Sequence, residues 1–325
     1  MKIIAANQNA IEQAATILKE GGLIGMPTET VYGLAANALD GKAVARIFEA
    51  KGRPSFNPLI THFARACDIE PYAEMDERAK ALAQKFWPGP LTMILKRKTN
   101  CPISDLVTAG LPTLAVRVPD HKAAQDLIRA AGVPLAAPSA NPSGTLSPTS
   151  AAHVARTLGD KVDLVLAAGS SRIGLESTVI DLSTEQSIIL RPGGITPEEL
   201  EETLGHKLHI AEQSDDIKSP GQLLKHYAPK TPLRLNAVDL NPDEALLAFG
   251  STKFMGIKGG GAATDLPEDM IRNLSETGDL HEAASNLFTM LHDMDAHNHR
   301  AIAVMSIPDI GVGIAINDRL KRAAN

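Results

Sequence analysis

The sequence is poor in cysteine and in aromatic residues, and both shortages narrow what the protein can be. Cys67 and Cys101 are the only cysteines among 325 residues and form no C-x-x-C pair, so neither a disulfide framework nor a zinc site is expected. Aromatic residues make up 3% of the chain, which leaves Ala, Leu, Ile and Val to build the core. No apolar run typical of a signal peptide opens the chain, and the longest uncharged stretch, 130–152, is broken by prolines. These features predict a soluble, cytoplasmic protein.

Basic residues are also fewer than acidic residues. The 32 Lys and Arg stand against 38 Asp and Glu, a formal net charge of -6, which argues against a globally basic nucleic-acid coat but leaves room for a local basic groove. The composition, with 44% hydrophobic and 22% charged residues, is that of a globular protein and excludes wholesale disorder and coiled coil. The length suits two domains.

Helical and strand patterns alternate along the chain, which predicts an α/β fold. In the first domain, 1–205, we expect helices at 11–20 and 41–51 and strands at 23–26, 91–96, 114–118, 162–167, 178–182 and 188–190. Thr196, Pro197 and Glu199 predict a helix start, and Gly205 its end. Residues 206–232 lose periodicity and are interpreted as a linker that acts as a lid. In the second domain, 233–325, strands at 233–238, 245–249 and 301–306 and helices near 268–276 and at 280–294 and 314–323 predict a smaller parallel, Rossmann-like domain.

Four loops at strand ends have compositions that suit an anion. They are the segment 25–34 with its hydroxyls and one carboxylate, the corner Lys51-Gly52-Arg53, the polar segment 138–144, and Arg191 followed by Pro192 and two glycines. Each alone also fits an ordinary turn or solvated charge. Neither a G-x-x-x-x-G-K-[ST] nor a G-x-S-x-G motif occurs, which excludes a P-loop enzyme and offers no nucleophile elbow. Histidines and aspartates at 292–299 are interpreted as a fraying helix end, so no metal ligands are predicted there.

Seven ordered motifs in the first domain resemble a known family. PTETVYGL, KGRP with NPL and His62, FWPGPLT, LAVRVP, APSANPSG with SPT, ESTVID and LRPGG follow the order typical of the YrdC-like domain. The later SPG and HYAP and the closing GIAINDRLKRAA are similar to the two-domain threonylcarbamoyl-AMP synthases, also called L-threonylcarbamoyladenylate synthases. The resemblance implies a twisted, open α/β sheet with a concave, positively lined cavity, followed by a smaller Rossmann-like domain.

The same resemblance implies an enzyme, a nucleotidyltransferase. Its reaction would join L-threonine, bicarbonate and ATP into threonylcarbamoyl-AMP and pyrophosphate, with Mg²⁺ accompanying the ATP. The product would serve a downstream threonylcarbamoyl transferase machinery that modifies adenosine in tRNA, and direct contact with tRNA is a possible addition. No membrane partner is implied.

Site residues follow from the resemblance by motif position. Lys51 and Arg53 are implied as catalytic. The ATP-binding residues implied are Lys51, Arg53, Asn57, Thr113, Ser139, Asn141, Ser147, Arg191 and Tyr227. The L-threonine-binding residues implied are Thr30, His62, Arg117, Ala137 through its backbone, and Ser177. The chain departs from the family at Lys225, where arginine is common, so an ammonium replaces a planar guanidinium.

Two other functions fit parts of the sequence. An RNA-binding module would use the concave surface, although the balance of -2 over residues 1–205 and the few aromatics count against it. A carbamoyl-transfer enzyme acting on carbamoyl phosphate would use the YrdC-like domain alone, whereas the HYAP and AINDRL segments favour the synthase. The sequence leaves open whether His62 transfers a proton or only binds.

Overall fold

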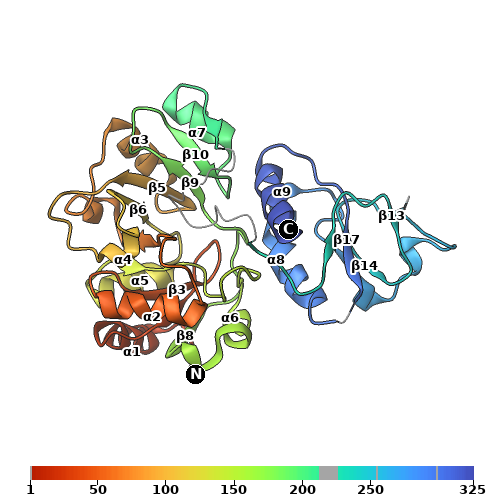
Figure 1. Ribbon diagram of the computed structural model, residues 1–325, viewed down its shortest axis with the longest axis horizontal. Helices are drawn as coiled ribbons and strands as arrows, with labels where there is room; N and C mark the ends of the chain where they lie inside the picture. The colour runs from red at the N-terminus through yellow and green to blue at the C-terminus, as the bar shows by residue number, and fades with distance from the viewer. Residues whose placement is uncertain (1, 212–225, 254, 298) are drawn as a thin grey trace. The chain divides into compact units, whose positions relative to one another are not determined.

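A computed structural model describes residues 2–211, 226–253, 255–297 and 299–325, which divide into two units (Figure 1). The first unit holds the described residues up to 211, apart from two short segments. The second holds those from 226 onward together with Gly144–Leu146 and Ile173–Leu175. The centre of the predicted linker, 212–225, lies outside the described residues, and so does Lys225.

The first unit is built on one large mixed sheet. Its strand order is β1-β8-β2-β3-β7-β4-β6-β5-β9-β10-β11. Strand β4 runs parallel to β6, whereas β5 runs antiparallel to β6 and β3 antiparallel to β2. The bounds are β1 Lys2–Ala5, β2 Ile24–Met26, β3 Gly33–Asn37, β4 Ile60–His62, β5 Leu91–Lys96, β6 Thr113–Arg117, β7 Leu135–Ala136, β8 Leu164–Ala167, β9 Thr178–Asp181, β10 Ile188–Arg191 and β11 His209–Ile210.

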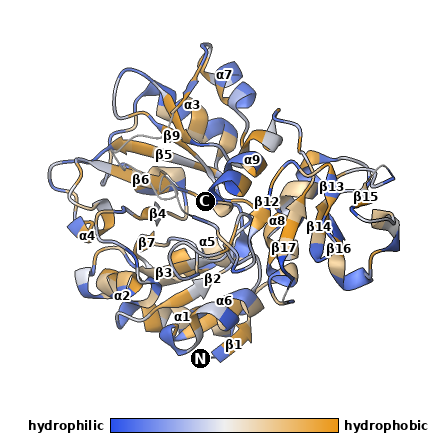
Figure 2. Cartoon of the chain, turned by 45° about the vertical axis from the view of Figure 1, so that its right-hand side comes forward, coloured by the Kyte–Doolittle hydropathy of each residue, from blue (hydrophilic) through white to orange (hydrophobic). Residues whose placement is uncertain are grey.

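Helices bury apolar side chains against this sheet, and β3 shows how one strand serves two cores. Leu34 and Ala36 belong to the cluster that includes Val44 of α2, while Ala35 between them belongs to the cluster that includes Leu18 of α1. This alternation follows from the two-residue period of a strand. Figure 2 shows α1 and α2 with mixed hydrophilic and hydrophobic colouring, as amphipathic helices require. The bounds are α1 Gln8–Lys19, α2 Gly41–Lys51, α3 Glu77–Phe86, α4 Asp105–Thr108, α5 Lys122–Ala131, α6 Ala151–Leu158, α7 Pro197–Leu204, and the 3₁₀ turns η1 Ala66–Ile69 and η2 Gly159–Lys161.

The second unit carries a four-stranded parallel sheet in the order β12-β17-β14-β16. The predicted parallel α/β domain is therefore confirmed. Its elements are β12 Leu233–Arg234, β13 Asp239–Leu240, β14 Glu244–Ala248, β15 Gly256–Ile257, β16 Ile271–Asn273, β17 Ala301–Val304, α8 Leu280–Met294, α9 Val312–Ala323, η3 Ala263–Asp265 and η4 Glu268–Met270.

The helix predicted near 268–276 is wrong. A single 3₁₀ turn, Glu268–Met270, follows Pro267, and the chain then enters β16. Backbone pairing of Ile271, Arg272 and Asn273 with β14 accounts for the difference, because a parallel neighbour supplies hydrogen bonds that the local pattern could not reveal.

Candidate functional site

Lys51 and Arg53 flank the residue that ends helix α2. Asp40 caps the helix start by accepting a hydrogen bond from the backbone N of Lys42. Gly52 ends the helix at a φ of 59°, in the left-handed region that glycine adopts without strain. The predicted corner is therefore confirmed, and local signals fix both of its ends.

The Lys51 ammonium connects this corner to the loop after β7. Its Nζ donates hydrogen bonds to the carbonyl of Ser139, at 2.5 Å, and to the carbonyl of Asn141. In addition, the backbone N of Ser143 donates to the Lys51 carbonyl at 2.8 Å. Three residues predicted to bind ATP are thus brought together.

Arg53 is held against the start of the next strand. Its Nη2 donates to Oδ1 of Asn57 at 2.6 Å and to the Pro58 carbonyl at 2.9 Å. The Asn57 side chain is buried, and its Nδ2 has no hydrogen-bond partner among the described residues. That amide is a buried donor available to an acceptor from outside the chain.

Burial, together with the charge of Arg53, lowers the pKa of Lys51 well below its usual value. Lys51 as a whole residue is 3% exposed, and among the described residues its Nζ reaches carbonyl oxygens rather than a carboxylate. An anion bound here would favour the charged form of Lys51.

A second group of predicted residues lies on and beside β4 and β6. His62 and Arg117 are the last residues of these parallel strands and are register partners, whereas the backbone N of Ala137 donates to the carbonyl of Ile60, the first residue of β4, at 2.9 Å. Burial and the charge of Arg117 lower the pKa of His62 to about 3, so its imidazole is neutral at physiological pH.

Arg117 makes a buried ion pair with Glu29, which the sequence analysis left without a role. Nη2 of Arg117 lies 2.7 Å from Oε1 of Glu29, and both side chains are buried. The neighbouring Thr30 is also buried, and its Oγ1 lies 2.8 Å from Oγ1 of Thr28. The signal that could have found Glu29 is a carboxylate in a loop otherwise made of hydroxyl and apolar residues.

Ser177, predicted to bind L-threonine, contacts a residue predicted to bind ATP. Its Oγ lies 2.7 Å from Oγ1 of Thr92. Arg191, predicted to bind ATP, donates from Nη2 to the Ser177 carbonyl at 2.9 Å. Ser147, also predicted for ATP, donates to Oε1 of Glu176, the residue before Ser177.

Thr113 takes no part in these contacts among the described residues. Thr113 begins β6, four residues and about 13 Å along the strand from Arg117.

Tyr227 belongs to the second unit, where its buried ring lies 5.7 Å from Phe288 and 5.2 Å from Cζ of Arg319. Its φ of 64° is uncommon for a bulky residue. Such strain often accompanies function. The predicted contact of Tyr227 with ATP stays a prediction.

Two aspartates near the end of α8 have structural partners. Asp293 pairs with Arg272 at 2.6 Å, and Asp295 accepts from the backbone N of Thr231 at 2.8 Å. Within the described part of the chain, no group of three His, Cys, Asp or Glu side chains could hold a metal ion.

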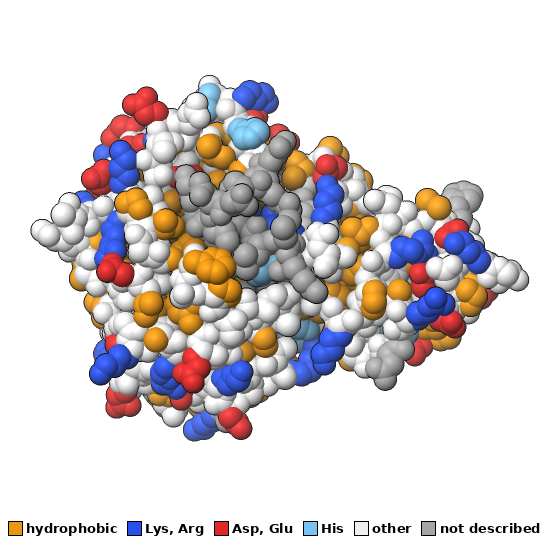
Figure 3. All heavy atoms as spheres, in the orientation of Figure 1, with side chains coloured by type: hydrophobic (Ala, Val, Ile, Leu, Met, Phe, Trp, Pro, Cys, Tyr) orange, Lys and Arg blue, Asp and Glu red, His pale blue; other side chains and the backbone are white. Residues whose placement is uncertain are grey.

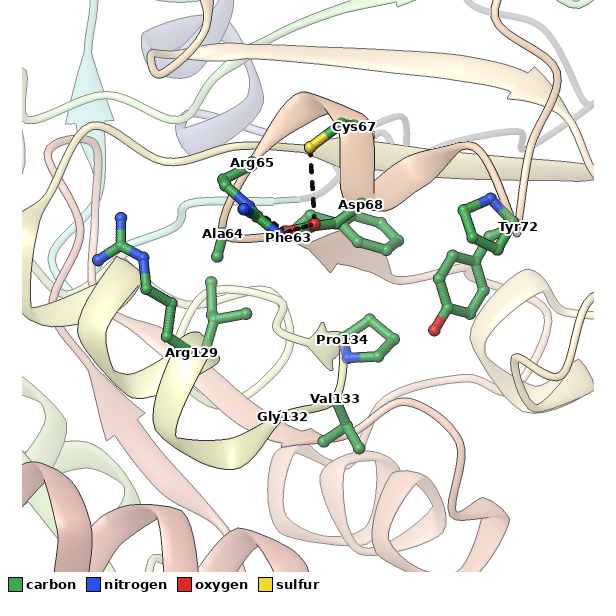
Figure 4. Close-up of a pocket in the computed structure, with 12 residues that line it drawn as sticks. Phe63, Ala64, Arg65, Cys67, Asp68, Tyr72, Arg129, Gly132, Val133 and Pro134 are labelled. Carbon is green, nitrogen blue, oxygen red and sulfur yellow. Dashed lines mark hydrogen bonds and ion pairs between the residues drawn. The ribbon is translucent and has the colours of Figure 1, made fainter.

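A separate cavity of about 610 Å³ lies between η1 and the end of α5 (Figure 4). Phe63, Arg65, Cys67, Tyr72 and Arg129 are among its lining residues, and none of the predicted site residues lines it.

The surface carries charges of both signs. On the face seen in Figure 3, Lys and Arg are interspersed with Asp and Glu. Among the described helices, none is long and apolar enough to cross a membrane.

Two family models match the chain. The model described as "Telomere recombination" matches residues 16–193, and "Threonylcarbamoyl-AMP synthase, C-terminal domain" matches residues 195–325. A Bacillus subtilis protein named threonylcarbamoyl-AMP synthase is 40% identical over 99% of this chain and 94% of its own length. A Pyrococcus abyssi protein of the same name is 42% identical over 100% of this chain and 98% of its own length.

The fold is similar to a solved structure described as P. abyssi Sua5 complexed with L-threonine. The TM-score is 0.87 at 38% identity, and the likeness covers 99% of this chain and 96% of the other.

Proposed function

The chain belongs to the family of threonylcarbamoyl-AMP synthases, and from this membership we infer that it is the enzyme that makes threonylcarbamoyl-AMP from L-threonine for tRNA modification. The observation that carries the inference is the full-length likeness to a protein whose solved structure is complexed with L-threonine. The buried polar residues of the first unit supply the chemistry that such a reaction needs.

The proposed reaction uses L-threonine, bicarbonate and ATP. The threonine amine and bicarbonate form a carbamate with loss of water. A carbamate oxygen then attacks the α-phosphorus of ATP, the bond from that phosphorus to the bridging oxygen breaks, and pyrophosphate leaves. This chemistry depends on positioning and charge stabilisation, which fixed cations and amides provide without a protein nucleophile.

The triphosphate would bind at the corner after α2. Lys51 and Arg53 supply positive charge there, and the unpartnered Nδ2 of Asn57 supplies a donor. The further residues proposed for ATP are Thr113, Ser139, Asn141, Ser147, Arg191 and Tyr227.

L-threonine would bind at the carboxyl ends of β4 and β6. Arg117 would take the substrate carboxylate, and neutral His62, its register partner, would donate or accept a hydrogen bond beside it. Thr30, Ala137 and Ser177 complete the proposed threonine site.

Mg²⁺ would reach the site bound to ATP. The described residues fit that arrangement better than a protein cage for the ion, because Mg²⁺ is usually held by substrate phosphates with one or two carboxylates. Glu176 is the carboxylate in contact with a proposed ATP residue, Ser147, and would be the chain's own ligand. The ion would neutralise charge on the phosphates.

The product would pass to a threonylcarbamoyl transferase that modifies tRNA, and we propose that the enzyme works in the cytoplasm. Threonylcarbamoyl-AMP is a mixed anhydride that water can hydrolyse, so the consuming reaction must follow closely.

Mass analysis of the reaction products tests the proposal. The full chain with ATP, Mg²⁺, bicarbonate and L-threonine should give threonylcarbamoyl-AMP and pyrophosphate, and samples without threonine or bicarbonate should give neither. Threonine-dependent release of ADP and phosphate without pyrophosphate would contradict the proposed reaction.

A further inference from the structure

One oxygen of the buried Glu29 carboxylate lacks a partner. Glu29 is 1% exposed, and its Oε1 accepts the hydrogen bond from Arg117. Its Oε2 has no hydrogen-bond partner among the residues that the structure describes. Leaving a buried, charged acceptor unsatisfied costs free energy, so the position suits a donor that arrives with a ligand.

Arg117 also has N–H groups that make no hydrogen bond among the described residues. Its Nη2 donates to Glu29 and its Nε to the Gly89 carbonyl at 3.3 Å. Across the described residues, Nη1 makes no hydrogen bond, although a guanidinium carries five N–H donors. The pair therefore offers donors from its positive member and an acceptor from its negative member, next to each other.

This pattern of charge is the complement of an α-amino acid. A zwitterionic amino acid carries a carboxylate and an ammonium on one carbon atom, so it can meet an adjacent cation and anion at once. We propose that Oε2 of Glu29 binds the α-ammonium group of L-threonine while Arg117 binds its carboxylate, an assignment that rests on the proposed function. Glu29 would then be a substrate-binding residue as well as the partner of Arg117.

The two nearby histidines do not compete for this role, and the carboxylate of Asp120 already pairs with Arg172 at 2.9 Å. His62 is neutral at physiological pH and lies across from Arg117. His121, which lies within the electrostatic influence of Glu29, has its pKa lowered by burial, and Nδ1 has no partner in the described part of the chain. Among these groups Glu29 alone has a buried carboxylate oxygen without a partner among the described residues.

A purely structural role makes a different prediction. If Glu29 only orients Arg117, its loss should weaken every ligand that places a carboxylate on Arg117, whether or not the ligand carries an amino group. If Oε2 binds the ammonium, the loss should be specific to ligands with that group.

Calorimetric titration of the full chain separates the two roles. The variant Glu29→Gln keeps the size of the side chain and an oxygen that can accept from Arg117. L-Threonine and 3-hydroxybutyrate, which lacks only the amino group, serve as matched ligands, and ATP is the control for the nucleotide site. We expect Glu29→Gln to weaken L-threonine about 10–150-fold, the range for a charge-assisted hydrogen bond, and not to weaken 3-hydroxybutyrate, because the substitution also removes the negative charge that repels a simple carboxylate.

Equal weakening of both ligands, or no weakening of either, would overturn the assignment. Failure of the unmodified protein to bind L-threonine would instead overturn the proposed function on which it rests. Should Glu29→Gln not fold, as judged by circular dichroism, Glu29→Asp keeps the charge but shortens its reach. That variant should weaken L-threonine at least about tenfold more than 3-hydroxybutyrate, and equal effects would refute the proposal.

Discussion

The buried ammonium of Lys51 should make ATP binding weaken as pH rises. Burial and the neighbouring Arg53 lower the pKa of Lys51, because both disfavour its charged form. A bound triphosphate favours the charged form and raises that pKa again. ATP therefore binds the protonated protein better, and its affinity falls once the pH exceeds the lowered pKa of the free protein.

The size of the loss in ATP affinity follows from the hydrogen bond between the Lys51 ammonium and the triphosphate. A single proton limits the slope to about tenfold in affinity per pH unit. The total loss is that of one charge-assisted hydrogen bond, about 1.5–3 kcal/mol, or about 10–150-fold.

The stability of the unliganded protein should change in the opposite direction. In the unfolded chain Lys51 has its ordinary pKa of 10.5, whereas in the folded protein the pKa is lower. Between these two values the unfolded chain binds more protons, so the free energy of unfolding rises with pH.

Calorimetric titration with Mg-ATP between about pH 7 and about pH 10 tests this reasoning, with Lys51→Arg as the matched variant. Arginine stays protonated throughout, so the ATP affinity of the variant should not change with pH. The same decline in both proteins would assign the pH dependence to other groups and refute the role of Lys51.

Three further predictions concern other predicted site residues. Arg117→Ala should weaken L-threonine about 10–150-fold and spare ATP, and Arg53→Ala should do the reverse; calorimetry in which both variants weaken only ATP would contradict the division. Because the pKa of His62 is about 3, L-threonine affinity should not change around pH 6.5. Between about pH 3 and about pH 6.5 the unfolded histidine takes up a proton that the folded one does not, so His62→Gln should remove the loss of stability that the unmodified protein shows as pH falls through this range. A change of L-threonine affinity near pH 6.5 that His62→Gln abolishes would refute a neutral His62. Tyr227→Phe should lower ATP affinity about fivefold, and unchanged affinity in the same titration would remove its hydroxyl from the nucleotide site.

The sequence predicted best where short-range signals decide the structure. Helix α2 has the predicted bounds Gly41–Lys51, because a capping aspartate and a left-handed glycine lie at its two ends. Helix α7 begins with the predicted capping box between Thr196 and Glu199. In contrast, β16 needed its parallel neighbour β14 and was predicted as helix.

In the site, too, contacts between distant segments could not be predicted from local sequence patterns. Motif order indicated the individual residues, but their contacts join distant segments. Lys51 and Ser139 are 88 residues apart in the chain, and so are Glu29 and Arg117. No periodicity or spacing reveals which carboxylate will lie against a buried arginine, so Glu29 was overlooked although its loop was identified.

The two ends of the site differ in how their buried charges are balanced, and the difference matches the proposed substrates. At the nucleotide end, the described partners of the Lys51 ammonium are carbonyl oxygens, which leaves its positive charge to be met by a polyanion such as ATP. At the threonine end, Arg117 already has Glu29 as its counter-ion, so that end of the site is close to neutral. An anion would gain little there, because the carboxylate of Glu29 would repel it, whereas a zwitterion satisfies both members of the pair. In the proposed site, the pairing of Arg117 with Glu29 would thus favour an amino acid over a simple carboxylate and would leave the triphosphate to the Lys51 end.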